Sequence, residues 1–166
     1  EHFKAFLAGA RVVDQHVRHT SLEENVPVLL ALLGHWNQNA LGFRSHAVLP
    51  YAEDLGRLPA YLQQADMESN GKFVGRDGKP VSWNTGAVVW GEPGTNSQHA
   101  FFQLLHQGTE IHPVDFVAFK TPTSEHEGMH RMLLANALAQ AEALLQGRKA
   151  PEEEPHRFFP GNRPST

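Results

Sequence analysis

Apolar residues in the first part of the chain recur at spacings that predict two helices. From Phe3 to Val17 they fall every three or four positions, which gives one apolar face. Residues 21–24 form a Ser-Leu-Glu-Glu capping box that we expect to open the second helix, with Pro27 tolerated in its first turn. Residues 28–33 are apolar on every side, which is typical of a helix buried on all its faces.

Short apolar runs alternate with helical patterns through the rest of the chain. The runs predict strands at residues 45–49, 87–90 and 114–119. The helical patterns predict one helix with Leu55, Leu58, Leu62 and Ala65 inward that stops near Asn70, one over 97–107, and one from a second capping box at 124–127 to Gly147. Gly71 is expected to close the first of these in the left-handed conformation, and Asp77-Gly78 predicts a hairpin turn.

This alternation indicates an α/β fold with a mostly parallel sheet. Three strands make a thin sheet, so we expect strands from elsewhere to extend it, and we interpret residues 1–148 as part of a larger domain. Residues 149–166 hold four prolines and a run of three glutamates, which predicts a loop or extended tail. The start at Glu1, without an initiator Met, indicates an internal portion of a longer protein.

Composition excludes several classes of function. The 14 basic and 18 acidic residues give a net charge of −4, so the chain has no broad cationic surface for nucleic acid or an anionic membrane. No segment approaches the ~18 apolar residues that a membrane span needs. The absence of cysteine excludes a disulfide scaffold, a thiolate metal site and a cysteine nucleophile, and it fits a reducing compartment.

The eleven histidines raise the possibility of a metal site. His126 and His130 are four positions apart, with Glu127 between them, and offer two ligands in principle. Two surface histidines on the first turn of a capped helix are the favoured interpretation, and we assign no metal.

Two other places combine reactive side chains with a suggestive local structure. Glu68 falls in the last turn of a predicted helix, where the helix dipole disfavours its ionised form and makes it a better proton acceptor. His99 follows a strand–glycine loop–helix junction, where Thr95 or Asn96 is expected to cap the helix and free N–H groups can receive a ligand. A solvated helix-end glutamate and a plain first-turn histidine remain the alternatives.

Taken together, these segments resemble glucose-6-phosphate isomerase. Residues 25–34, 133–136 and 161–164 are also similar to that family. The two segments that carry the resemblance are Asp66-Met67-Glu68-Ser69-Asn70-Gly71-Lys72 and Val89-Trp90-Gly91-Glu92-Pro93-Gly94-Thr95-Asn96-Ser97-Gln98-His99-Ala100-Phe101.

The resemblance implies a sugar-isomerase (SIS-type) three-layer α/β sandwich, a homodimer, a cytoplasmic location and no cofactor. It implies that Glu68 moves a proton between C1 and C2 of a sugar phosphate through a cis-enediolate, and that Gln64 faces the substrate. It further implies that His99 helps to open the sugar ring in the active site of the partner subunit. The remaining segments of the enzyme are then partners of this chain.

Several family segments have no counterpart in these residues. They are the segment with the arginine that stabilises the enediolate, the Ser/Thr-rich loop that grips the phosphate, and the C-terminal signature with its lysine. We therefore expect the 166 residues alone to be inactive. A non-catalytic role, in binding sugar phosphates or in extracellular signalling, is the alternative to catalysis.

Overall fold

The computed structural model describes every residue of the chain except Ser124, and it divides the chain into two compact units, residues 1–42 and 43–166. The first unit holds helices α1 (His2–His19) and α2 (Val26–Asn39), and the second holds the sheet and the remaining helices. Within the described part of the chain, every helix falls short of the length and apolar character that a membrane crossing requires.

The two predicted helices of the first unit are confirmed, but a different residue caps the second. Asn25 precedes α2, and its side-chain oxygen accepts a hydrogen bond from the Val28 N–H at 3.4 Å. Its amide group also donates to the Val17 carbonyl at 2.9 Å. The expected capping box at 21–24 is wrong, because Asn25 takes the cap position and ties the start of α2 to the end of α1.

The apolar run 28–33 on α2 is exposed in the described unit. Leu30 is 49% exposed, Leu32 is 60% exposed, and no residue of α2 is buried. The expectation of burial on all faces is therefore wrong for this unit. The physical reason is that a pair of helices offers each member only one covered face.

The second unit is built on a sheet of three parallel strands, β1 (Ser45–Pro50), β2 (Val88–Trp90) and β3 (Val114–Val117). Their spatial order is β2-β1-β3, and Ala47 lies opposite both Trp90 and Val114. Each predicted strand is confirmed, and so is the α/β class with its parallel sheet. The sheet is open, with β2 and β3 as the outer strands.

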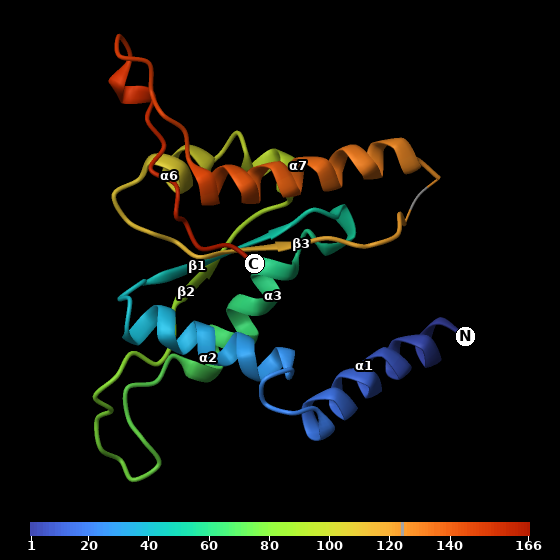
Figure 1. Cartoon of the computed structure of the whole chain (residues 1–166). Helices are drawn as coiled ribbons and strands as arrows, with labels where there is room; N and C mark the ends of the chain where they lie inside the picture. The colour runs from blue at the N-terminus through green and yellow to red at the C-terminus, as the bar shows by residue number, and fades with distance from the viewer. Residues whose placement is uncertain (124) are drawn as a thin grey trace. The chain divides into compact units, whose positions relative to one another are not determined.

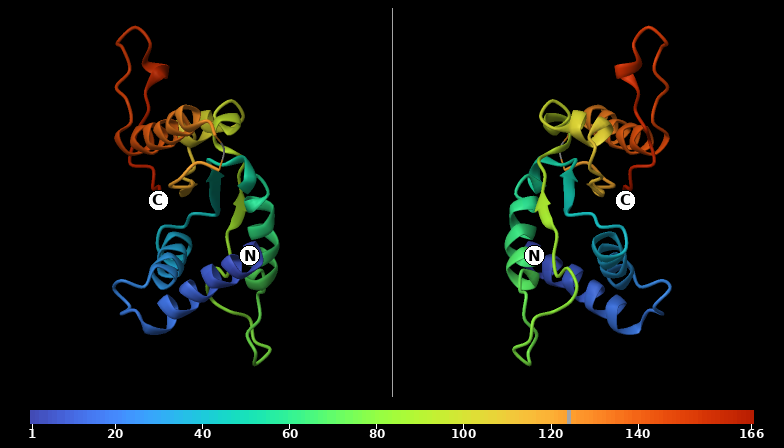
Figure 2. Two further views of the ribbon diagram at one scale, coloured as in Figure 1. Left: turned by 90° about the vertical axis from the view of Figure 1, so that its right-hand side faces the viewer. Right: turned by 90° about the vertical axis from the view of Figure 1, so that its left-hand side faces the viewer.

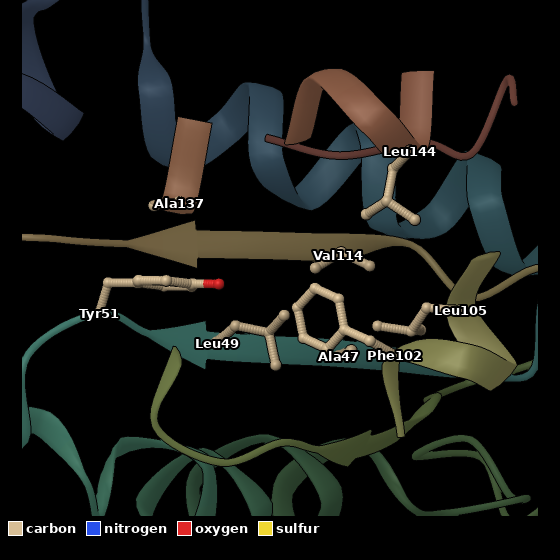
Figure 3. Packing of buried hydrophobic residues seen from close by; sticks show 8 residues of the cluster. All are labelled: Ala47, Leu49, Tyr51, Phe102, Leu105, Val114, Ala137 and Leu144. Atoms are coloured by element: carbon tan, nitrogen blue, oxygen red, sulfur yellow. The ribbon is translucent and has the colours of Figure 1, made fainter. Parts of the chain in front are cut away.

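Helices cover both faces of this sheet, which gives three layers within residues 43–166 (Figure 1). Helix α3 (Leu58–Leu62) lies on one face, and α6 (Phe102–Gln107) and α7 (Glu127–Gln146) lie on the other. Figure 3 shows the buried side chains of the second face packed between the strands and these helices. The cluster consists of Ala47, Leu49, Tyr51, Phe102, Leu105, Val114, Ala137 and Leu144.

The helix that was expected to stop near Asn70 is confirmed, with an internal irregularity. After a short 3₁₀ turn, η1 (Glu53–Leu55), α3 passes into a π-helical turn, η2 (Gln63–Met67), and ends with α4 (Glu68–Asn70). Gly71 has φ −69°, so the expected left-handed cap is wrong. Glycine is needed here for space instead, because an added Cβ would lie 2.4 Å from the Met67 carbonyl oxygen.

The helix expected over 97–107 is split in two. Helix α5 (Gly94–Ser97) starts earlier than expected, with Pro93 at its N-cap and no side-chain cap from Thr95 or Asn96. Turns then connect it to α6. The split has a packing cause. Phe101 packs edge-on against Trp90, with the ring centroids 4.8 Å apart, while the adjacent Phe102 packs into the core.

Two further predictions concern the Asp77-Gly78 turn and the ends of α7. The Asp77-Gly78 turn is confirmed, with Gly78 at φ +75° and an antiparallel bridge between Val74 and Pro80. Helix α7 ends before Gly147 as expected, whereas the predicted capping box begins at Ser124, which lies outside the described residues.

Beyond α7, the chain first leaves the sheet and then returns to it. Residues 149–158 extend away as a loop in both views of Figure 2, with a 3₁₀ turn, η3 (Pro155–Arg157), inside it. The last residues then come back beside β3, where the Thr166 N–H donates to the Val114 carbonyl at 2.9 Å. Ser165 forms a parallel bridge with Val114.

Candidate active site

Glu68 lies in the last turn of the helical run that crosses one face of the sheet. Gly56, before the run, lies against Pro93, which follows β2. Asn70, the last residue of the run, lies against Gly86, which precedes β2. The run therefore returns from the carboxyl end of β2 to its amino end, and it leaves the exposed Glu68 at the amino end.

Gln64 and Glu68 are brought together by this run. They are four positions apart, close to one helical turn, and both are exposed. The neighbouring Gln63 has a structural role instead, because its side-chain amide donates to the Val89 carbonyl of β2 at 3.0 Å. The π-helical turn begins at Gln63 itself and ends directly before Glu68, and such turns are frequent at functional sites.

Lys72 closes the carboxyl end of the same run. Its ammonium group donates to the backbone carbonyl of Glu68 at 2.6 Å and to that of Ser69 at 2.8 Å. The side-chain amide of Asn70 also donates to the Asp66 carboxylate at 2.5 Å, one turn back along the run. The backbone that carries the candidate base is thus held by bonds on both sides.

The glycine loop after β2 packs directly on β1. Gly91 has φ +148°, and an added Cβ would lie 1.9 Å from the Val48 carbonyl oxygen. Gly94 is in close contact with the Tyr51 ring, and an added Cβ would be 2.4 Å from ring carbons. Burial raises the pKa of Tyr51, and the hydrogen bond that its hydroxyl accepts from Gln98 at 2.9 Å acts to lower it. The loop therefore has no room for side chains at either glycine.

His99 lies in the turn between α5 and α6, and not in the first turn of one long helix as expected. Its backbone N–H donates to the Asn96 carbonyl at 3.0 Å, and its side chain is exposed. The turn is anchored on both sides, because the buried Ser97 hydroxyl donates to the Gly94 carbonyl at 2.6 Å and Phe101 packs against Trp90. An exposed imidazole on a fixed turn is available to a ligand that approaches from outside.

The chain does not bring Glu68 and His99 together. The run that carries Glu68 lies on the α3 face of the sheet, whereas His99 leads into α6 on the opposite face (Figure 1). Glu68 also lies at the amino end of β2, and His99 follows the loop at its carboxyl end. One copy of this chain therefore presents the two candidate groups as separate surfaces.

A second polar cluster lies at the amino end of β1. The Trp90 indole N–H donates to Ser45 Oγ at 3.0 Å, and Ser45 Oγ lies 2.6 Å from His112 Nδ1. Burial lowers the pKa of His112, as does the charge of Arg163, while Glu110 acts to raise it. A neutral His112 fits its role as a hydrogen-bond partner in a half-buried site.

A third cluster joins β1, β3 and the end of the chain. His46 Nε2 lies 2.8 Å from the Asp115 carboxylate, which also accepts a hydrogen bond from the Thr166 hydroxyl. Burial acts to raise the pKa of Asp115, but the His46 and Thr166 interactions outweigh it, so the pKa lies below its ordinary value. Among the described residues, no three His, Asp or Glu side chains are grouped as metal ligands.

Two residues of the site were missed by the sequence reasoning. Lys72 carries a signal that could have found it, because a lysine just past a helix end is a recognised partner for the last carbonyls. Gln63 gave no sequence pattern of its own, because its bond to β2 depends on the π-helical turn and on tertiary contact.

Comparison with known proteins places the whole chain in one group. The family model described as phosphoglucose isomerase matches residues 1–166. Glucose-6-phosphate isomerases from Brucella ovis and Brucella canis are each 52% identical over 185 aligned residues, covering 99% of this chain. The chain spans 33% of the length of these relatives.

Solved structures agree with the sequence comparison. The crystal structure of a glucose-6-phosphate isomerase from Chlamydia trachomatis matches with a TM-score of 0.88 at 44% identity, covering 96% of this chain and 32% of that one. A hypothetical protein from Thermus thermophilus, TT0462, matches with a TM-score of 0.67 at 29% identity over 84% of this chain and 35% of that one. The similarity therefore extends over both sequence and fold.

Proposed function

The chain belongs to the phosphoglucose isomerase family, and we propose that the full-length protein interconverts glucose 6-phosphate and fructose 6-phosphate. This reaction serves glycolysis and gluconeogenesis. The cytoplasmic location and the homodimer that the family resemblance implies are part of the same proposal. Sugar phosphate is the substrate, and the segments outside these 166 residues contribute the loop that binds its phosphate group.

In this proposal Glu68 is the general base. Its carboxylate takes the proton from C2 of the open-chain aldose and returns it to C1. The hydroxyl proton of the C2 oxygen passes to the C1 oxygen, which completes the ketose. Gln64, one turn earlier on the same run, contacts the substrate. The supporting observation is that Glu68 is exposed on a helix end whose backbone is fixed by Gln63 and Lys72. A carbon-bound proton moves efficiently only to a base held at a fixed place.

His99 is proposed to open the sugar ring in the active site of the partner subunit. Support comes from the separation of His99 and Glu68 onto opposite faces of the sheet, because one chain cannot offer both to the same sugar. The anchored turn around His99 suits a group that transfers a proton across an interface. We also expect the 166 residues alone to lack measurable turnover, because the family segments that bind the phosphate and stabilise the enediolate lie outside them.

The test is exchange of the C2 hydrogen with solvent deuterium, measured in the full-length protein by NMR. Glu68→Gln keeps the shape of the side chain but cannot accept a proton, so exchange and isomerisation should fall by ~10²–10⁴-fold or more. Glu142→Gln, an exposed glutamate on α7, is the matched control and should keep the wild-type rate.

Two results would contradict the proposal. A Glu68→Gln protein whose rate stays within tenfold of wild type would remove Glu68 from its role as the base. A wild-type protein that binds sugar phosphate without any exchange would favour the non-catalytic alternative instead.

A further inference from the structure

We propose that Lys72 is a positioning residue for Glu68, which it holds through the main chain and without contact to the substrate. The Lys72 ammonium group binds the backbone carbonyls of Glu68 and Ser69, at 2.6 and 2.8 Å. The inference rests on the proposed function, because it assumes that Glu68 is the base.

The end of this helical run needs such a partner. The last carbonyls of a helix have no intrahelical N–H to accept from, so an unassisted end frays into solvent. The final segment, α4, is only three residues long and begins at Glu68 itself. The π-helical turn that precedes it already departs from the regular α-helical bonding pattern. A cation at the carboxyl end satisfies two of these carbonyls and interacts favourably with the helix dipole.

The turn after the helix brings Lys72 back over that end. The Gly71 N–H donates to the Met67 carbonyl at 2.8 Å, and the Lys72 N–H donates to the Asn70 carbonyl at 2.7 Å. The tight approach at Gly71 leaves no room for a Cβ, which would lie 2.4 Å from the Met67 oxygen. The backbone is thus folded so that the Lys72 side chain reaches the carbonyl of the very residue that carries the carboxylate.

The base is consequently held from both directions. Upstream, the Gln63 amide fixes the run to the Val89 carbonyl of β2 at 3.0 Å. Downstream, Lys72 fixes the last turn. Glu68 lies between these two anchors, five residues after one and four before the other. Loss of either anchor allows the carboxylate to move relative to the sheet and to the bound sugar.

The expected consequence falls on the chemical step. A displacement of about 1 Å at a reacting group can cost ~10²-fold in rate, because proton transfer requires close alignment. Lys72→Met keeps the length and the apolar stem of the side chain but removes its donors. We expect kcat to fall about tenfold to hundredfold while KM changes by less than about threefold. A lysine that bound the sugar phosphate directly would instead raise KM when replaced.

The experiment compares four single variants of the full-length protein in steady-state kinetics. Lys72→Met should be slow, and Lys72→Arg, which can donate to both carbonyls, should regain most of kcat. Lys79→Met removes the same charge from the exposed hairpin and should behave as wild type. Lys72→Gln keeps one donating amide and should lie between Lys72→Met and wild type, so it carries the test if the Met variant fails to fold.

Glu68→Gln, alone and combined with Lys72→Met, separates this inference from the proposed function. If Lys72 acts only through Glu68, the double variant is no slower than Glu68→Gln alone. A Lys72→Met protein with wild-type kcat, a change confined to KM, or an additive double variant overturns the positioning role and leaves Glu68 as the base. A fully active Glu68→Gln overturns both.

Discussion

Replacement of Gly91 by alanine should destabilise the second unit more than any other single methyl addition to the glycine loop. The methyl group would lie 1.9 Å from the Val48 carbonyl oxygen, 2.8 Å from its carbon and 3.1 Å from its nitrogen. All three atoms belong to the backbone of β1, which is paired on both sides and cannot retreat. The loop itself must therefore lift away from the strand.

Two costs add at this position. Relief of overpacking against a rigid neighbour typically costs ~1–3 kcal/mol. The φ of +148° is a conformation that a residue with a Cβ rarely adopts, and holding it there costs a further ~1–3 kcal/mol. We therefore expect a loss of about 2–6 kcal/mol in the free energy of unfolding. The loop also leads to His99, so turnover of cyclic sugar phosphate should fall as well.

The measurement is urea unfolding of the full-length protein, followed by circular dichroism at a fixed protein concentration. Gly128→Ala is the matched control, because the methyl group there has no atom within 4 Å and lies in the first turns of α7. It should be neutral or stabilising by up to about 1 kcal/mol, since alanine restricts the unfolded chain. A Gly91→Ala protein within about 1 kcal/mol of wild type would refute the close approach of the loop to β1.

Two further outcomes follow from the titratable side chains. His99→Ala should slow turnover of the cyclic sugar more than that of a substrate supplied in open-chain form, by stopped flow; equal slowing would indicate a structural loss. The lowered pKa of Asp115 contributes stability at pH values above the ordinary carboxyl value of 3.8, and this contribution is lost as the pH falls through the lower, folded-state pKa. The urea midpoint of Asp115→Asn should therefore lie below wild type near pH 6 and approach it as the pH drops toward 3, and a constant difference would contradict this.

The strands and long helices were predictable because their patterns are local. The parallel runs at 45–49 and 114–119 needed only continuous apolar residues, and α1 needed only its spacing of three and four. The break between α5 and α6 was not predictable in this way. It arises because Phe101 and Phe102, adjacent in sequence, pack against different partners, and tertiary packing overrides helical propensity there.

The candidate site shows a similar division. The sequence motifs singled out Glu68 and His99, but the rule that ligands gather at the carboxyl ends of strands favoured only the surroundings of His99. Glu68 lies at the other end, because a helix that joins two parallel strands must return to the amino end of the next one. The position of Glu68 could therefore have been predicted from the order of strands and helices along the chain. The π-helical turn had no local pattern that predicted it.

The placement of Glu68 and His99 on opposite faces of the sheet also bears on inheritance. Under the proposed role of His99, each working site draws one residue from each of two subunits. A subunit defective only at Glu68 and a subunit defective only at His99 would each be inactive in homodimers. In a mixed dimer, however, the intact Glu68 of one and the intact His99 of the other meet in a single site. Two null alleles of this gene would then complement each other, with half of the sites in each mixed dimer restored.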